Sequence, residues 1–379
     1  MRGSVTLWQM PRPCSWCAPV SVVAITAFAP TSGGQTFLPL YSELSQNGTS
    51  GMAVSSDGTY VTGRGSVPSG ATHAFLWTHG SPLDLGNIYG GAEGTGVTDN
   101  GSVVVGYSGW APPQPISQRA FRWSIAAGME DLGTVAGKPS AEAWGVSDDG
   151  SVVVGRGFTN YSDAVAFRWT RETGMTSLSR PPGAAYSSAS AVSRDGAVVV
   201  GYCESGSEDH AVRWTSSGEM QDLGGLPGAL SSRASATNGD GSVVVGSSDR
   251  RAFRWTLDGG VEDLGTLAGQ TTAAQAVNAD GSVIAGFGFA TGQGFLASIW
   301  TANTGWQDLN TLLPGLGVDL AGWRLREVTA ISADGLTVVG NGTYLGQQLG
   351  WVASIPAPGG VVTGLGLAIL AATRRRRSG

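Results

Sequence analysis

The chain has 379 residues, of which 41% are hydrophobic, 13% are charged and 60 are glycine. So little charge excludes a disordered acidic chain, and glycine without a Gly-x-y period excludes collagen; short strands joined by tight turns are favoured instead. Without residues 1–40 and 356–379, which hold six arginines and no acid, the 22 basic residues fall to 16 against 28 acidic ones, a formal charge of −12. Such a body repels phosphate backbones, so we expect no binding to nucleic acid.

Residues 1–35 have the layout of a secretory signal. Arg2 and Arg12 precede an apolar stretch over 18–29, and small residues follow over 31–34. Ala27-Phe28-Ala29 has the small-x-small form of a cleavage site, but Pro30 behind it usually blocks cleavage, which leaves a later cut or a misassigned start open. We therefore predict that this segment directs export.

Cysteine supplies no structural framework in this sequence. Cys14 and Cys17 form a C-x-x-C inside the predicted signal, away from any βαβ pattern, so we expect neither a redox site nor zinc binding there. Cys203 is then alone in the remaining chain, and a single cysteine closes no internal disulfide. The domain must hold together by packing.

One phrase returns between the two ends: Ala-x-x-Val-Ser-x-Asp-Gly, then Val-Val-Val-Gly, then Ala-Phe-Arg-Trp-Thr, then Asp-Leu-Gly. Its turn glycines, preceded by Asp in six copies and by Asn in one, are Gly58, Gly101, Gly150, Gly196, Gly241, Gly281 and Gly335. Tryptophans keep step with them at Trp77, Trp123, Trp169, Trp214, Trp255, Trp300 and Trp351. Two independent landmarks therefore count seven units.

Each unit is predicted to form four strands. Asp-Gly between apolar runs is a strong hairpin signal, and we expect a two-residue type I′ turn with positive φ at both positions. The valine runs do not alternate with polar residues, so these strands should be covered on both faces. The Phe-Arg-Trp segments do alternate, which places Phe and Trp on one face, and we expect the tryptophans to pack between neighbouring units.

Four strands per unit, repeated seven times, predict an all-β, seven-bladed β-propeller of four-stranded blades over residues 36–355. The last unit reaches Pro356 without an Asp-Leu-Gly strand, whereas residues 36–40 form an unpaired strand-like run. This N-terminal strand can complete the last blade and close the ring, which removes exposed sheet edges. A β-solenoid, which needs shorter coils and capped ends, is the alternative.

The repeated phrases resemble the HAF family of extracellular repeats, named for His-Ala-Phe. His73-Ala74-Phe75 keeps the tripeptide, His210-Ala211-Val212 keeps part of it, and Arg251-Ala252-Phe253 replaces the histidine. The resemblance covers residues 36–355. It implies a secreted protein and says little about activity.

Residues 356–379 form a tripartite end: Pro356-Ala357-Pro358, an apolar run over 359–372, and Arg374-Arg375-Arg376-Arg377. The apolar run is shorter than the ~20 residues of a permanent span, and arginines behind it are held on the cytoplasmic side. Over residues 355–379 this end resembles the PEP-CTERM family of bacterial sorting signals, which implies processing by an exosortase after transient membrane anchoring. Ala357 departs from the usual Glu, and a lone C-terminal anchor helix is the alternative.

No catalytic or metal-binding constellation is evident. His73, His79 and His210 lack partners at metal-ligand spacing, and one aspartate per turn falls far short of the six to eight oxygens that calcium takes. The aspartates of the Asp-Leu-Gly phrase can pair across strands with the arginines of Phe-Arg-Trp, as Asp131 can with Arg122. No Ser-His-Asp order or Walker loop occurs, so we expect no enzyme, no cofactor and no metal.

Residues that depart from the repeat indicate a ligand site, because departures cluster on loops at one end of a propeller. The aromatic candidates are Tyr107, Trp110, Tyr161, Tyr202 and Trp323. We expect an exported bacterial surface or extracellular-matrix protein, a non-catalytic structural or binding propeller whose partner is an extracellular polysaccharide or a surface protein. The alternatives are a polysaccharide-active lyase or hydrolase, which needs acids converging near the axis, and a protein-binding adhesion module, which needs an exposed apolar patch.

Overall fold

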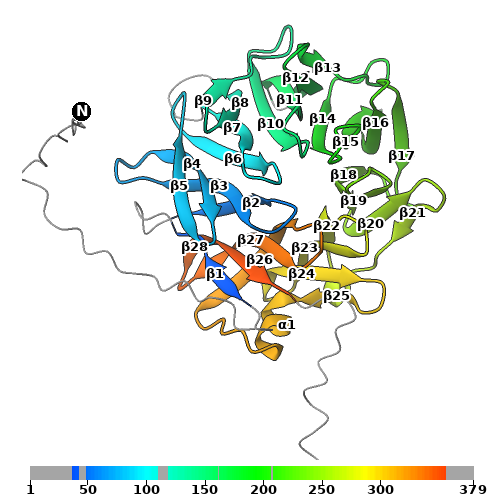
Figure 1. The fold of residues 1–379 in the computed structure, drawn as a ribbon. Helices are drawn as coiled ribbons and strands as arrows, with labels where there is room; N and C mark the ends of the chain where they lie inside the picture. Colours follow the sequence, from blue (N-terminus) through cyan, green and yellow to red (C-terminus); the bar gives the residue numbers. More distant parts are fainter. Residues whose placement is uncertain (1–35, 42–47, 110–117, 161, 206–207, 356–379) are drawn as a thin grey trace, which may run out of the picture.

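In the computed structural model, antiparallel strands form seven four-stranded sheets that follow one another around a ring (Figure 1). The residues that the structure describes are 36–41, 48–109, 118–160, 162–205 and 208–355. This arrangement confirms the predicted seven-bladed β-propeller and is incompatible with a solenoid.

Each of the first six blades is continuous in sequence, and its strands run in chain order from the inner to the outer edge. Blade one consists of β2(Ser50–Val54), β3(Tyr60–Ser66), β4(Thr72–Thr78) and β5(Ser81–Gly86). Blade two consists of β6(Ala92–Val97), β7(Val103–Ser108), β8(Arg119–Ser124) and β9(Gly128–Asp131). Blade three consists of β10(Ser140–Val146), β11(Val152–Asn160), β12(Asp163–Thr170) and β13(Gly174–Ser177). Blade four consists of β14(Ser187–Val192), β15(Val198–Ser205), β16(Glu208–Thr215) and β17(Met220–Gly224). Blade five consists of β18(Ser232–Thr237), β19(Val243–Ser248), β20(Arg251–Thr256) and β21(Gly260–Asp263). Blade six consists of β22(Thr272–Val277), β23(Val283–Ala290), β24(Gly294–Thr301) and β25(Gly305–Asp308).

The seventh blade takes its strands from both ends of the chain. Three strands come from the C-terminal side, β26(Trp323–Ile331), β27(Thr337–Tyr344) and β28(Gln347–Ser354), and β1(Phe37–Pro39) is the outer strand beside β28. The backbone N–H of Ser354 donates to the carbonyl of Thr36 at 2.8 Å, and Leu40 is fully buried among side chains of blades one and seven. The expected closure of the ring by an N-terminal strand is confirmed.

The second strand of each blade is covered on both faces, as its unbroken apolar run predicted. Val104, Val105 and Val153 have no exposed surface, and every residue of β7 is buried. In six blades the tryptophan of the third strand lies opposite the second apolar residue of the second strand, as Trp123 lies opposite Val104. The seventh blade differs from the expected single register: Trp351 lies opposite a glycine, at the position where most other blades place phenylalanine.

The turn between the first two strands is not the expected type I′ turn. Among the described turn residues only the glycine has positive φ, for example 70° at Gly150, and its N–H donates to the carbonyl of Ser147 at 2.9 Å. The Asp149 side chain accepts from the Ser147 hydroxyl at 2.6 Å and from the Ser151 N–H at 2.9 Å. The repeated Ser-x-Asp-Gly therefore encodes a longer loop that its own side chains hold in shape.

A β-bulge interrupts every inner strand at the same place and explains a second set of repeated glycines. The pairing between β10 and β11 shifts between Ala143 and Gly145, so Trp144 has no partner across the sheet. The glycine that ends Val-Val-Val-Gly lies opposite this bulge, and a Cβ atom there would stand closer than 3.0 Å to a backbone carbonyl of the inner strand, a distance that real Cβ atoms essentially never show. The seven such glycines are Gly63, Gly106, Gly155, Gly201, Gly246, Gly286 and Gly340.

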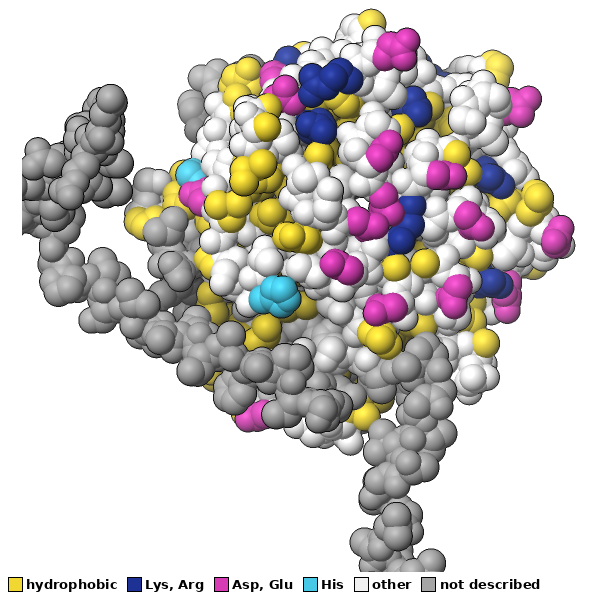
Figure 2. Space-filling model, viewed as in Figure 1, with side chains coloured by type: hydrophobic (Ala, Val, Ile, Leu, Met, Phe, Trp, Pro, Cys, Tyr) yellow, Lys and Arg dark blue, Asp and Glu magenta, His cyan; other side chains and the backbone are white. Residues whose placement is uncertain are grey.

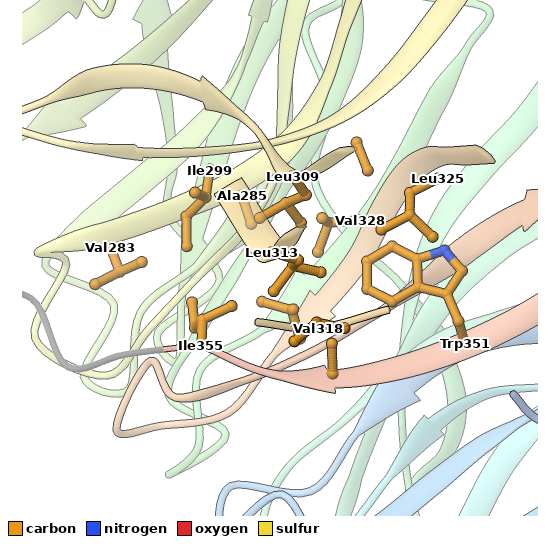
Figure 3. Close-up of a cluster of buried hydrophobic side chains, with 13 residues drawn as sticks. Val283, Ala285, Ile299, Leu309, Leu313, Val318, Leu325, Val328, Trp351 and Ile355 are labelled. Atoms are coloured by element: carbon orange, nitrogen blue, oxygen red, sulfur yellow. The ribbon is translucent and has the colours of Figure 1, made fainter. Parts of the chain in front are cut away.

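A short helix that the repeat did not predict fills the longest unit. α1(Leu309–Gly315) begins at Asp308, whose carboxylate accepts from the Asn310 N–H at 2.9 Å. Leu309 and Leu313 are fully buried in a cluster with Trp351, between blades six and seven (Figure 3). A side-chain cap therefore ends the outer strand of the sixth blade and turns the chain into the core.

The close approach at the bulge predicts an intolerance of any side chain at these glycines. Gly155→Ala should lower the free energy of unfolding by about 2 kcal/mol or more, because the three atoms nearest to the added methyl group belong to the backbone and cannot rotate away. Gly315→Ala is the matched control, since no atom lies within 4 Å of its Cβ position, and it should change the stability by less than about 0.5 kcal/mol. Urea unfolding of both variants measures the difference; equal effects would contradict this account.

Candidate functional site

The seven bulged residues meet around the axis of the propeller and line a channel through it. They are Met52, Thr95, Trp144, Ser190, Ser235, Gln275 and Thr329. On one side of this ring a cavity of about 250 Å³ extends to the Ser-x-Asp-Gly turns, and we call this end the turn face. On the other side a cavity of about 350 Å³ extends to the end where Tyr186 and Tyr202 lie, which we call the tyrosine face. The bulge thus directs one side chain per blade at the axis.

Aromatic and basic side chains from three consecutive blades form a connected group at the tyrosine face. Tyr202 stacks on Tyr186 with ring centroids 5.6 Å apart, and their hydroxyls lie 3.1 Å apart. The Arg233 guanidinium lies 4.7 Å from the centre of the Tyr202 ring, while its Nε donates to Asp209 at 2.8 Å. On the other flank Arg156 donates to the Tyr186 hydroxyl at 2.9 Å. These contacts fix the tyrosine rings at the rim of the channel.

A second group, on blades two and three, lies behind the first. Trp144 packs against Tyr107 with ring centroids 5.6 Å apart, and the Arg156 guanidinium lies 5.8 Å from the Trp144 ring. Two buried carboxylates are held beneath them: the Tyr107 hydroxyl donates to Glu93 at 2.6 Å, and Arg156 Nε donates to Glu142 at 2.8 Å. Arg156 therefore links the Glu142 carboxylate to the aromatic rings.

Burial sets the protonation of this group. It raises the pKa of the Glu142 carboxyl, a shift that Arg156 opposes and the charge of Glu93 reinforces. Burial also raises the pKa of both phenols, Tyr107 next to Glu93 and Tyr202 next to Tyr186. Both tyrosines are therefore neutral donors at physiological pH.

The turn face is closed by contacts from turn to turn around the axis. The second residue of the turn supplies them, with backbone hydrogen bonds from the Asp148 N–H to the Arg194 carbonyl at 2.9 Å and from the Arg194 N–H to the Gly239 carbonyl at 3.0 Å. A further bond joins the seventh blade to the first, from Ala333 N to the Ser56 carbonyl at 2.8 Å. These bonds tie neighbouring blades together at the rim.

Two carboxylates of this rim interact with each other. Asp148 shares a hydrogen bond with Asp99 of the preceding blade, and Arg194 Nε lies 3.6 Å from Asp148 Oδ2. Burial first, and then the bond to Asp99, raise the pKa of Asp148 to about 6, although Arg194 opposes the shift. Below about pH 6, Asp148 can therefore carry a proton and donate it in the bond to Asp99.

The predicted ligand residues fall in different places. Tyr202 lines the larger cavity, and Tyr107 lies behind Trp144, buried against Glu93. Trp323 stands apart from the cavity lining: its ring centroid lies 5.0 Å from that of Phe37 and 5.3 Å from that of Tyr344, and it packs on the core of Figure 3. Of the five candidates, Tyr202 thus lines the channel mouth, and Tyr107 packs against Trp144, which also lines it.

The other predicted residues lie outside the described part of the chain. They are the candidates Trp110 and Tyr161 and the sorting residues Pro356, Pro358, Arg374, Arg375, Arg376 and Arg377. Within the described ranges no helix is long and apolar enough to cross a membrane. The tail therefore stays a prediction.

The aspartates of the Asp-Leu-Gly phrase have other partners than those expected. Asp84 pairs with His73 at 2.8 Å and Asp131 pairs with Arg119 at 3.0 Å, so the first residue of the His-Ala-Phe position is the partner rather than the arginine before tryptophan. A bulge between the third and fourth strands, as at Ala74 and Phe75, brings them together. Each of these aspartates also accepts a backbone N–H two residues on, as Asp84 does from Gly86 at 2.8 Å. Within the described residues no group of three or more His, Cys, Asp or Glu side chains could hold a metal ion.

Most residues of the channel mouth were not singled out from the sequence. Glu93, Glu142 and Arg233 share one position, two residues before the bulge, and Arg156 lies opposite it on the next strand. The sequence did carry one signal for the channel lining. The first variable residue of the repeated Ala-x-x-Val-Ser phrase is the bulged residue, as Trp144 is. Cys203 lies in the same blade as Tyr202 but is buried, which raises the pKa of its thiol to about 12.

Comparison with known proteins supports the fold. No protein-family model and no curated protein matches the sequence. Solved structures that resemble it include an oligogalacturonate lyase in complex with manganese, at 12% identity and a TM-score of 0.55, covering 85% of this chain and 98% of that one. An oligogalacturonate lyase from Vibrio parahaemolyticus is 10% identical with a TM-score of 0.54, covering 85% and 97%, and TolB from Acinetobacter baumannii is 14% identical with a TM-score of 0.44, covering 79% and 81%. At these identities the likeness concerns the propeller architecture alone.

The raised pKa of Asp148 predicts a pH-dependent stability. Its ordinary value is 3.8 and its folded value is about 6, so folding favours the protonated form; this contribution is complete below about pH 4 and is lost as the pH rises through 6. Asp148→Asn keeps a hydrogen-bond donor toward Asp99 and removes the charge. The variant should therefore melt at a higher temperature than the wild type at pH 8 and at a similar temperature at pH 4.

Asp149→Asn is the matched control, because the pKa of Asp149 is lowered whereas that of Asp148 is raised. Hydrogen bonds from Ser147 and Ser151 lower the pKa of Asp149, so its contribution is present above its ordinary value of 3.8 and is lost as the pH falls through its lower folded value. This variant should melt below the wild type at pH 8, with a difference that narrows on acidification. Thermal melts monitored by circular dichroism measure both; a pH-independent difference for Asp148→Asn would contradict the shared proton.

Proposed function

We propose that this protein is an exported bacterial surface or extracellular-matrix component whose propeller binds a polysaccharide, without cleaving it, at the tyrosine face of its axial channel. The observation that carries the proposal is the convergence of Trp144, Tyr202 and Arg156 on one cavity of about 350 Å³. Aromatic rings supply flat apolar faces for sugar rings, and the serines and Gln275 in the same lining supply hydrogen bonds to hydroxyls. This combination suits a ligand rich in hydroxyl groups.

Binding is favoured over catalysis because most acids near the axis are covered. Glu93 and Glu142 are 5% and 3% exposed, and Tyr107 and Arg156 occupy their oxygens. Glycoside hydrolysis usually needs two carboxyl groups that flank the scissile bond. In the described lining of the larger cavity Glu327 is the one carboxylate, so a bound sugar would meet a single acid there.

A polysaccharide-active enzyme is the second candidate. Burial, reinforced by the charge of Glu93, raises the pKa of Glu142, and a buried carboxyl with a raised pKa beside aromatic rings is the environment of a general acid. For this function Arg156 and Tyr107 would have to move aside when substrate binds. Release of reducing ends or of unsaturated products during incubation with polysaccharide would favour this candidate over simple binding.

The export signal and the sorting tail belong to the same proposal. Both segments join the propeller at neighbouring residues on the turn face, where Ser354 bonds to Thr36. A tail held in the membrane before exosortase processing would therefore leave the tyrosine face turned away from the bilayer. The resemblance of the repeats to the HAF repeats of secreted proteins supports the proposed export.

The binding site can be tested by retention on the extracellular polysaccharide of the producing organism. The protein as its host produces it should be retained, and Tyr202→Ala should weaken retention about tenfold, because the change removes an aromatic face and the support of Arg233. Tyr89→Ala is the matched control: Tyr89 is 51% exposed and does not line the channel, so its retention should equal that of the wild type. Lack of any retention would remove polysaccharide binding and favour a protein partner.

The sorting tail predicts proteolytic processing. Mass spectrometry of the protein from its own host should find no peptide beyond about residue 358, because the processing enzyme would remove the apolar run and the four arginines. Replacement of Arg374 to Arg377 by serine should leave unprocessed protein. Secreted protein that keeps an intact arginine end would contradict the proposal.

A further inference from the structure

One carboxylate at the mouth of the channel has no cationic partner. Glu327, half-buried on β26, lines the larger cavity and accepts one hydrogen bond, from Asn341 Nδ2 at 3.1 Å. Within the described residues it forms no ion pair, whereas the other acids of this mouth do: Glu93 lies 3.6 Å from Arg64, and Glu142 and Asp209 accept hydrogen bonds from Arg156 and Arg233. Glu327 therefore presents an uncompensated negative charge to the cavity.

The neighbouring inner strand adds a second acceptor. Gln275, the bulged residue of β22, lines both cavities, and its buried Oε1 has no hydrogen-bond partner within the described structure. A buried carbonyl oxygen without a donor is costly, so this position favours a ligand or a water that donates. Blades six and seven thus each contribute one acceptor to the described lining of the cavity, and neither contributes a cation.

The opposite wall complements these acceptors. Trp144 and Tyr202 supply aromatic faces from blades three and four, and Arg156 is the one cation in the described lining. Because Arg156 donates to the buried Glu142, its charge is largely balanced by that carboxylate. The net field in the cavity therefore comes from Glu327, and it attracts a cation that also carries hydroxyl groups for the serines of the lining.

We infer that the polysaccharide bound at this mouth contains amino sugars with free ammonium groups, and that Glu327 and Gln275 receive the ammonium hydrogens. This inference rests on the proposed polysaccharide binding and adds the chemical class of the sugar. The rest of the molecule favours the same ligand, because the formal charge between the two ends is −12 and acidic side chains are spread over the face in view in Figure 2. Such a surface speeds the approach of a polycation.

The experiment compares three oligosaccharides of one length by calorimetry, with the protein as its host produces it. They are a β-1,4-linked glucosamine oligomer, its N-acetylated form and a β-1,4-linked glucose oligomer. The free amine should bind about tenfold more tightly than the two neutral oligomers at low salt, and added salt should reduce this ratio. Glu327→Gln should bring the ratio to about one, whereas Glu172→Gln, at an exposed turn outside the cavity lining, should leave it unchanged.

The outcomes separate this inference from the function on which it rests. Equal affinity for all three oligomers, or a preference that survives Glu327→Gln, would overturn the inference and leave polysaccharide binding intact. No binding of any oligomer, together with no retention on the native polysaccharide, would overturn the proposed function itself. A lysine oligomer that binds as tightly as the glucosamine oligomer would overturn the assignment to a sugar. If Glu327→Gln does not fold, Gln275→Lys provides the test, because a cation beside Glu327 should also abolish the preference.

Discussion

The β-bulge of the inner strands is the constraint on which the rest of the structure depends. It adds one residue to each inner strand, tilts the strand and brings its backbone so close to the second strand that only glycine fits opposite, as Gly155 does opposite Ala143. The same extra residue is the one that reaches the axis. A local backbone feature, repeated once per blade, therefore sets both the sequence phrase Val-Val-Val-Gly and the lining of the channel.

Because the backbone fixes where these side chains point, the channel can vary without changing the fold. The bulged position holds Trp144 in blade three, Ser190 in blade four and Gln275 in blade six, and the position two residues earlier is equally variable. The scaffold is close to seven-fold symmetric, but its mouth is not. Aromatic and basic groups gather on blades two to five, whereas blades six and seven offer acceptors, and this asymmetry gives the mouth a preferred chemistry.

The architecture was predictable because it rests on contacts that repeat. The turn phrase and the tryptophans gave the number of blades, and the unpaired run at residues 36–40 gave the closing strand. The errors arose where side chains decide: hydroxyls of Ser147 and Ser151 select a longer turn, and Asp131 pairs with Arg119 instead of the expected Arg122. The site was harder still, since Arg156 and Arg233 reach their partners across blades, and separation along the sequence does not report such contacts.

The closure of the ring also determines how the domain responds to force. Thr36 and Ser354 are joined by a backbone hydrogen bond and by bonds to the Ser354 hydroxyl, and β1 runs antiparallel to β28 from that point. A pull applied through both ends of the chain would load the bonds between these two strands one after another, as a zipper opens, instead of shearing them together. A load carried by one end alone would not pull β1 and β28 apart at the point where the two ends meet. A protein that bears traction in a matrix through this fold is therefore strongest when only one of its ends is tethered.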